Sequence, residues 1–172
     1  LDPESLKGVR PIASGLNVSP GAAVGVIAFD PTLAERWAKD EGKEVILVRP
    51  ETRPDDVHGM LAAKGVVTSK GGRTSHAALV ARQMGKVCIC GAGALQIDYD
   101  KKTVKVPGNS FKEGDYMSID GTAGTVFGGE LKTAPSEIIT GLLHGDKAAQ
   151  KTEKFKSFLQ LMKWCSKVTR LD

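Results

Sequence analysis

The sequence predicts an α/β domain with a partly closed sheet, followed by a helical C-terminal segment. Three observations lead to this prediction. Apolar runs of strand length alternate with stretches of helical period in the first half of the chain. After Gly91, short β-type segments are separated by glycine-containing turns. Beyond Leu131 the chain is lysine-rich, with apolar residues at three-to-four spacing.

Strands and helices are expected to alternate in the first half. Apolar side chains predict strands over residues 22–29, 44–49 and 65–68. Helices are predicted over residues 32–40, which is amphipathic, and over residues 77–84, where Gly85 provides the stop signal.

A short additional helix is predicted around His58. It would be capped near Thr52, and Pro54 would lie in its first turn. We expect His58 to pack or to make a hydrogen bond rather than to act in catalysis.

Cys88 and Cys90 are two positions apart in a further predicted strand, so their side chains should face one side. With Cys165 they make an odd number, which fits a reducing compartment and small core residues better than a disulfide set or a metal site. The following strands are predicted over residues 103–106, 116–120 and 125–127.

The C-terminal segment differs from the rest. Residues 133–136 indicate a break, and residues 147–167 predict a helix whose apolar stripe packs on this domain or on the next one. Its lysines indicate a solvated face rather than a nucleic-acid or membrane contact. The stripe consists of Phe155, Phe158, Leu159, Met162 and Cys165.

Composition is that of an ordinary soluble protein: 172 residues, 41% hydrophobic and 26% charged, with a formal net charge of +4. No apolar run is long enough to cross a bilayer, and the first residues do not resemble a signal peptide, so a cytoplasmic location is expected. Because the chain begins with leucine, we expect it to be part of a longer protein.

Residues 71–82, GGRTSHAALVAR, place His76 between a glycine-rich loop and an apolar helix. The first N–H groups of a helix have no partner within it, and the positive end of the helix dipole stabilises a phosphate. A neutral imidazole there has the lone pair needed to attack phosphorus. His76 is therefore the candidate catalytic residue. The groups expected to support the phosphate are Gly71, Gly72, Arg73, Thr74, Ser75 and Arg82.

The residues alone leave a plainer interpretation open, in which His76 only caps or packs the helix. Other catalytic interpretations fit less well. Ser75 lacks the second glycine of a nucleophile elbow, and no Gly-Lys-Ser/Thr follows the glycines as in a Walker loop.

The run GGRTSHAALVARQMGKVCICGA resembles the phosphohistidine signature of the PEP-utilising enzymes, which include pyruvate phosphate dikinases, PEP synthases and enzyme I of the sugar phosphotransferase system. ILVRPETRPDDVHGMLAAKGVVTSKGG, ASGLNVSPGAAVG and EGDYMSIDGTAGTVFGGE extend the resemblance over residues 10–131. Ser75 and MGKVCICG are similar to the dikinase subfamily, whereas Arg73 stands where many dikinases have methionine.

The resemblance implies a swivelling β/β/α phosphohistidine domain over residues 10–131. Residues 1–9 would be an N-terminal linker, and residues 132–172 a helical linker toward a PEP/pyruvate-binding TIM barrel outside this chain. Linkers on both sides would let one histidine visit two distant sites.

In such a dikinase, His76 would attack the β-phosphate of ATP at a nucleotide-grasp domain, forming pyrophosphoryl-histidine and AMP. Inorganic phosphate would then take the terminal phosphoryl group to give diphosphate, and the remaining one would pass to pyruvate, giving PEP. Mg²⁺ and a monovalent cation would be bound by these partner domains of the same polypeptide, with no metal bound by this domain, and the full-length enzyme would be a homodimer.

Three alternatives remain at this stage. The domain could come from a PEP synthase or from enzyme I, or it could be a non-enzymatic module that binds anions or nucleotides. Thr74 carries a further hypothesis, because plant-type dikinases are phosphorylated on the threonine two residues before the histidine. The alternative is that Thr74 caps the helix or orients His76.

Overall fold

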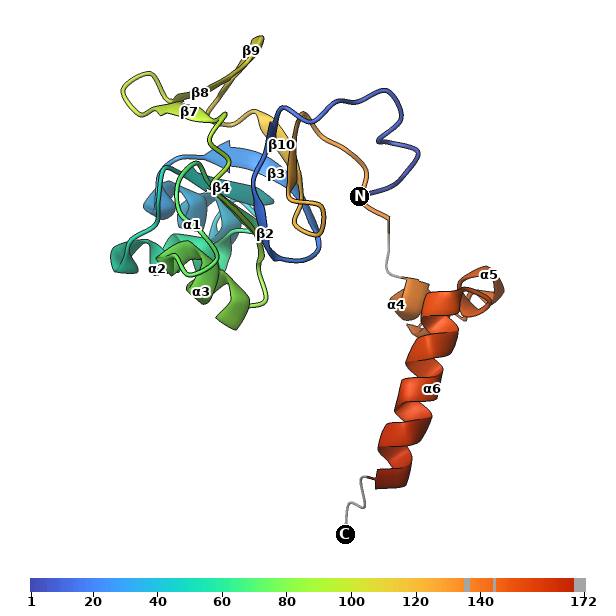
Figure 1. Cartoon of the computed structure of the whole chain (residues 1–172). Coiled ribbons are helices and arrows are strands. Elements are labelled where there is room, and N and C mark those ends of the chain that lie inside the picture. Colours follow the sequence, from blue (N-terminus) through green and yellow to red (C-terminus); the bar gives the residue numbers. More distant parts are fainter. Residues whose placement is uncertain (135–136, 144, 169–172) are drawn as a thin grey trace. The chain divides into compact units, whose positions relative to one another are not determined.

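The computed structural model describes residues 1–134, 137–143 and 145–168 (Figure 1). The chain divides into two compact units, Leu1–Thr133 and Ala134–Asp172. Part of the break predicted over residues 133–136 lies outside the described residues.

The first unit is built on a mixed eight-stranded sheet with the order β1-β11-β10-β3-β4-β5-β6-β2. The four strands from β3 to β6 are parallel to one another, and the strands beyond them on both sides pair antiparallel. The strands are β1 (Ala13–Ser14), β2 (Leu16–Ser19), β3 (Ala22–Ala28), β4 (Val45–Arg49), β5 (Gly65–Thr68), β6 (Val87–Cys90), β10 (Tyr116–Asp120) and β11 (Thr125–Gly128).

The two outermost strands bring the edges of this sheet together. β1 and β2 are separated in the chain only by Gly15, yet β1 pairs with β11 at one edge and β2 with β6 at the other. The Gly15 N–H donates to the Gly124 carbonyl at 2.9 Å. The expected partly closed sheet is therefore confirmed.

Helices cover one face of the sheet: α1 (Pro31–Lys39), a 3-10 turn (Pro54–Asp56), α2 (Val57–Ala62) and α3 (His76–Gln83) (Figure 1). Asp30 begins α1 by accepting the Leu33 N–H at 2.9 Å. Small side chains let the helices approach the strands closely. The buried residues on this side include Ala34, Met60, Ala77, Ala78 and Ala81 from the helices and Val45, Leu47, Val66, Cys88 and Cys90 from the strands.

A second, three-stranded antiparallel sheet contributes to the core on the other side. It contains β7 (Gln96–Asp98), β8 (Thr103–Val106) and β9 (Asn109–Lys112). Its apolar side chains, such as Val104, join those of Ile46 and Ile119 on the large sheet. The first unit therefore has three layers: the three-stranded sheet, the eight-stranded sheet and the helices. This is the β/β/α arrangement that the family resemblance implied.

Sequence patterns missed the shortest strands. β1 has two residues and β7 three, which is too short for alternation to be recognised, and β9 carries the polar residues Asn109 and Ser110 in a region interpreted as turn. These strands form by pairing with partners distant in sequence or with a hairpin neighbour, rather than through their own composition.

The second unit contains α4 (Glu137–Leu143), α5 (Lys147–Gln150) and α6 (Glu153–Val168). The predicted single helix over 147–167 is broken, because Thr152 begins a new helix by accepting the Phe155 N–H at 3.3 Å. Phe155 is buried, and a Cβ on Gly141 would come within 2.5 Å of its ring. Leu159 and Met162 are 40% and 50% exposed. None of the helices described is long and apolar enough to cross a membrane.

Candidate functional site

His76 is the first residue of α3 and lies beyond the carboxyl end of β5, to which a loop of residues 69–75 connects it. Ser75 caps the helix, since its Oγ accepts the Ala78 N–H at 3.4 Å. The imidazole is half-buried. Ligands of open α/β sheets bind outside the carboxyl ends of parallel strands, and His76 occupies that position. The predicted place of His76 at a helix start is confirmed.

Thr52 holds one nitrogen of the imidazole. Its Oγ1 lies 3.0 Å from His76 Nδ1, and Thr52 is only 7% exposed. The predicted cap near Thr52 and the place of Pro54 in the first turn are confirmed: the turn begins at Arg53, whose N–H donates to Asp56 Oδ2 at 2.9 Å. Thr52 follows β4 and His76 follows β5, so adjacent parallel strands bring them together. Nδ1 of His76 is thus engaged by the Thr52 hydroxyl.

An arginine at the end of β4 fixes the segment that carries Thr52. Arg49 donates to the Phe29 carbonyl at 3.1 Å and forms an ion pair with Asp56 at 3.3 Å. Its guanidinium also lies 5.4 Å from the centre of the Tyr99 ring. Because Asp56 is 4% exposed, this pair is shielded from water and holds the turn more firmly than a surface pair would.

The glycine loop lies directly on the turn that follows β6. Gly71 has φ +92° and Gly91 has φ +69°, both in the region that favours glycine. A Cβ at Gly91 would come within 2.8 Å of the Gly71 carbonyl oxygen. At Gly72 a Cβ would meet no atom within 4 Å, so the backbone there is open to an approaching group.

The two arginines of the motif are bonded to β2 and to the loop. Arg82 donates to the Val18 carbonyl at 3.2 Å and to the Arg73 carbonyl at 2.9 Å. The Arg73 guanidinium donates to Asn17 Oδ1 at 3.3 Å. Arg82, in the last turn of α3, therefore ties the loop before that helix to the edge strand β2. Thr74 is exposed on the loop, and it is Ser75 rather than Thr74 that caps the helix.

The second histidine of this unit has a different setting. His58 Nε2 lies 3.4 Å from Thr32 Oγ1 and 4.0 Å from Glu35 Oε2, on the exposed sides of α1 and α2. The hydrogen bond agrees with the structural role expected for it. In the part of the chain that the structure describes, no group of three or more His, Cys, Asp or Glu side chains could hold a metal ion.

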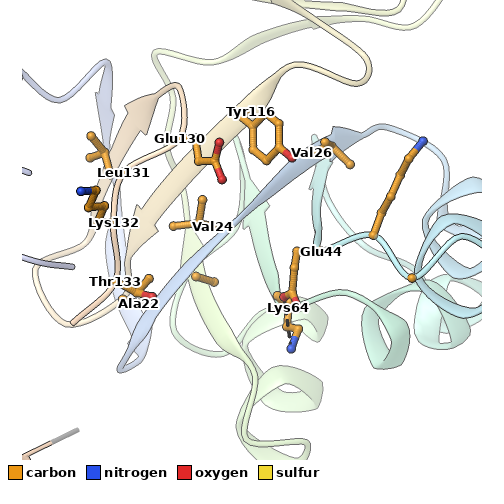
Figure 2. A pocket seen from close by; sticks show the side chains of 13 residues that line it. Ala22, Val24, Val26, Glu44, Lys64, Tyr116, Glu130, Leu131, Lys132 and Thr133 are labelled. Carbon is orange, nitrogen blue, oxygen red and sulfur yellow. Dashed lines mark ion pairs between the residues drawn. The ribbon is translucent and has the colours of Figure 1, made fainter. Parts of the chain in front are cut away.

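A cavity of about 880 Å³ lies at the opposite end of the sheet (Figure 2). It is lined by residues at the amino ends of β3, β4 and β5, together with residues 130–133. Figure 2 shows Glu44 beside Lys64 on one side and Tyr116 with Glu130 on the other. Glu44 and Lys64 form an exposed ion pair of 3.1 Å. His76 does not line this cavity.

A three-layer β/β/α domain that presents a histidine at a helix start belongs to a recognisable class. Residues 41–124, which contain Thr52, the glycine loop and His76, match the family described as PEP-utilising enzyme, mobile domain. This chain belongs to that family, as its resemblance to the PEP-utilising enzymes indicated.

Within the family, the chain is similar to pyruvate, phosphate dikinases. It is 50% identical over 136 residues to pyruvate, phosphate dikinase of Giardia intestinalis, 48% over 127 residues to pyruvate, phosphate dikinase 2 of Zea mays, and 44% over 138 residues to pyruvate, phosphate dikinase of Clostridium symbiosum. These matches cover 78%, 74% and 80% of this chain. They cover only 15%, 14% and 16% of the relatives, which are much longer proteins.

Proposed function

We propose that this chain is the phosphoryl carrier domain of a pyruvate, phosphate dikinase, with His76 as the residue that carries the phosphoryl group. The observation that supports this most strongly is the 3.0 Å contact between Thr52 Oγ1 and His76 Nδ1 at the start of α3. It fixes the orientation of an imidazole that lies beyond the carboxyl ends of the parallel strands and inside the segment that matches the family, whereas the bond of His58 to Thr32 lies on the exposed sides of α1 and α2.

The contact assigns roles to the two ring nitrogens. In a neutral imidazole one nitrogen carries the proton and the other a lone pair. When Nδ1–H donates to Thr52, the lone pair is on Nε2, which attacks the β-phosphorus of ATP while the bond from that phosphorus to the AMP oxygen breaks. The new phosphoryl oxygens would be held by first-turn N–H groups other than that of Ala78, which Ser75 accepts, and by the open backbone at Gly72.

The reaction proposed for the whole enzyme converts ATP, phosphate and pyruvate into AMP, diphosphate and PEP. Its partners would be a nucleotide-grasp domain and a PEP/pyruvate TIM barrel of the same polypeptide. Mg²⁺ and a monovalent cation would be bound by those domains, as the resemblance to the dikinases implies. We further propose that the full-length enzyme is a homodimer located in the cytoplasm.

A carrier domain must also move between its partner domains. In the first unit, the first residues of the chain and the segment around Lys132 lie together, so the unit could turn about that point. The Asp2 N–H donates to the Lys132 carbonyl at 2.9 Å, and Ser5 Oγ donates to the same oxygen at 3.3 Å. Residues 130–133 line the cavity at the amino ends of the strands, far along the sheet from His76. Residues 1–9 and 132–172 would therefore act as paired linkers at one end of the domain, and His76 would lie at the other end.

Thr74 supports a second, regulatory role at the same site. Its hydroxyl is exposed on the loop, and helix capping is done by Ser75, so Thr74 is open to a kinase. A phosphate on Thr74 would place negative charge where the substrate phosphate must bind. We expect Thr74→Glu to lower labelling of His76 and Thr74→Val to leave it nearly unchanged. Equal labelling of both variants would contradict the regulatory role.

The test of the carrier role is covalent labelling of the full-length protein with ATP labelled in its β-phosphate. We expect acid-labile, base-stable label that is lost in His76→Gln. His58→Gln is the matched control, since His58 also faces a threonine but lies on α2, and it should retain the label. Label that survives His76→Gln would overturn the proposal.

The phosphate donor distinguishes the subfamilies. A dikinase takes label from ATP and needs inorganic phosphate to turn over. A PEP synthase turns over without phosphate, and enzyme I takes label only from PEP. A non-enzymatic binding module would bind its anion reversibly and would tolerate His76→Gln.

A further inference from the structure

Two thiols meet beneath the first turn of α3. Cys88 and Cys90 are both 0% exposed on the helix-facing side of β6, and their Sγ atoms lie 3.7 Å apart. Cys90 Sγ is 3.6 Å from Ser75 Oγ, and Cys88 Sγ is 4.0 Å from the Ala77 carbonyl oxygen. The pair thus contacts the residues on both sides of His76, although the carrier chemistry makes no use of either thiol.

A direct disulfide fits this pair poorly. Residues two apart in an extended strand have Cα atoms about 6.6 Å apart, from a rise of about 3.3 Å per residue. This is at the upper end of the roughly 4.4–6.8 Å seen in disulfides, whose sulfurs must also approach to about 2.0 Å. A single atom bonded to both sulfurs would bridge the pair with less movement of β6.

The two thiols differ in acidity. A hydrogen bond from the Cys88 thiol lowers the pKa of Cys90 to about 6, against the opposing effect of burial. Smaller contributions come from Thr68, Ser75 and the positive charge of Arg82. The hydrogen bond between the thiols and burial raise the pKa of Cys88. Cys90 is therefore the stronger nucleophile of the two and would react first. The adjacent Cys88 thiol could then react with the same atom.

We propose that Cys88 and Cys90 form a binding site for one soft, thiophilic atom, trivalent arsenic, and that its occupation disables His76. Arsenious acid exchanges two of its hydroxyl groups for the two sulfurs: two As–S bonds form, two As–O bonds break, and the two thiol protons leave in two water molecules. Arsenic stays trivalent, so no oxidant is required. Soft thiolate ligands are the donors that such atoms prefer.

The consequence for His76 follows from packing. An added atom between β6 and α3 overfills a contact made of small side chains, Ala77 and Ala78 among them, so the start of the helix must shift. Ser75 is the first residue displaced, and it caps the helix that carries the imidazole. This second half of the inference rests on the proposed carrier function, whereas arsenic binding does not.

The test begins with native mass spectrometry of this chain after exposure to arsenite. We expect one arsenic atom per chain, binding slowly because the thiols must first be exposed by local opening of α3. Cys165→Ser removes the exposed cysteine of α6 and should bind arsenic as before, whereas Cys90→Ser should bind none. Absence of arsenic, or equal binding by Cys90→Ser, would overturn the site.

Two further measurements distinguish arsenic binding at Cys88 and Cys90 from its effect on His76. Hydrogen exchange of residues 75–78 should accelerate when arsenic binds, whether or not His76 carries phosphate. In the full-length protein, labelling of His76 should fall about tenfold or more, as an overfilled contact implies. A dithiol added in solution should remove the arsenic and restore the labelling of His76, whereas a monothiol should not. This comparison tests whether two cysteines hold the arsenic without any substitution in the protein. Arsenic bound with exchange and labelling unchanged would overturn the coupling to His76.

Discussion

The two ends of the large sheet differ, and the difference favours the carboxyl end as the functional one. The amino end has a cavity of about 880 Å³, but its charged side chains include an exposed ion pair, Glu44 with Lys64, and the chain enters and leaves the unit there. The carboxyl end has a half-buried histidine held by Thr52, a glycine loop and a helix start.

The difference shows that the volume of a cavity is a poor guide for a carrier domain. A carrier does not enclose its substrate, because partner domains supply most of the substrate's surroundings. It has to present one reactive atom with a fixed orientation. The end with oriented groups is therefore a stronger candidate than the end with empty space.

The largest effect on the fold should come from the close contact between Gly91 and Gly71. Gly91→Ala forces a residue with φ +69° to carry a Cβ that would lie 2.8 Å from the Gly71 carbonyl oxygen. We expect a loss of roughly 1–3 kcal/mol in the free energy of unfolding, measured by chemical denaturation, together with slower labelling of His76.

Gly42→Ala is the matched control at the amino end. Gly42 has φ +64°, but a Cβ there would meet nothing within 4 Å. It should cost only the conformational penalty of about 1 kcal/mol and should leave labelling unchanged. Equal losses in the two variants would show that the loop contact at the carboxyl end has no special importance.

The next effect concerns the orientation of the imidazole. Thr52→Val keeps the size of a buried side chain but removes the hydroxyl that holds His76 Nδ1. One hydrogen bond of about 1.4 kcal/mol corresponds to a roughly tenfold fall in the initial labelling rate. Thr32→Val, which removes the hydroxyl facing His58, should label at the normal rate. A Thr52→Val variant that labels normally would remove the reason for assigning Nε2 as the nucleophile.

The smallest effect should come from the cavity. Lys64→Met breaks the ion pair with Glu44, but both side chains are more than half exposed, so stability should change by no more than about 0.5 kcal/mol. Labelling of His76 should be unchanged. A large loss of labelling in Lys64→Met would mean that the amino end takes part in phosphoryl transfer.

Much of the fold could be predicted from sequence because its determinants are local. The apolar runs of β3, β4 and β5 and the capped start of α3 follow from residues that are close together in the chain. The helix break at Thr152 was missed because it depends on one side-chain hydrogen bond, to the Phe155 N–H.

The candidate site was only partly predictable for the same reason. His76 and its glycine loop lie in one short motif, so they could be recognised directly. Thr52 is 24 positions away and reaches His76 because β4 and β5 are neighbours, which no spacing in the sequence reveals. The contact of Arg82 with Val18 spans 64 positions, and it too depends on the order of strands in the sheet.

In the proposed reaction, Nε2 of His76 carries the phosphoryl group while Thr52 holds Nδ1. Nuclear magnetic resonance of the phosphorylated full-length protein, labelled with nitrogen-15 in its histidines, tests it directly by showing which ring nitrogen couples to phosphorus. We predict coupling to Nε2 of His76 alone, with Nδ1 protonated. Coupling to Nδ1, or to any other histidine, would contradict the account.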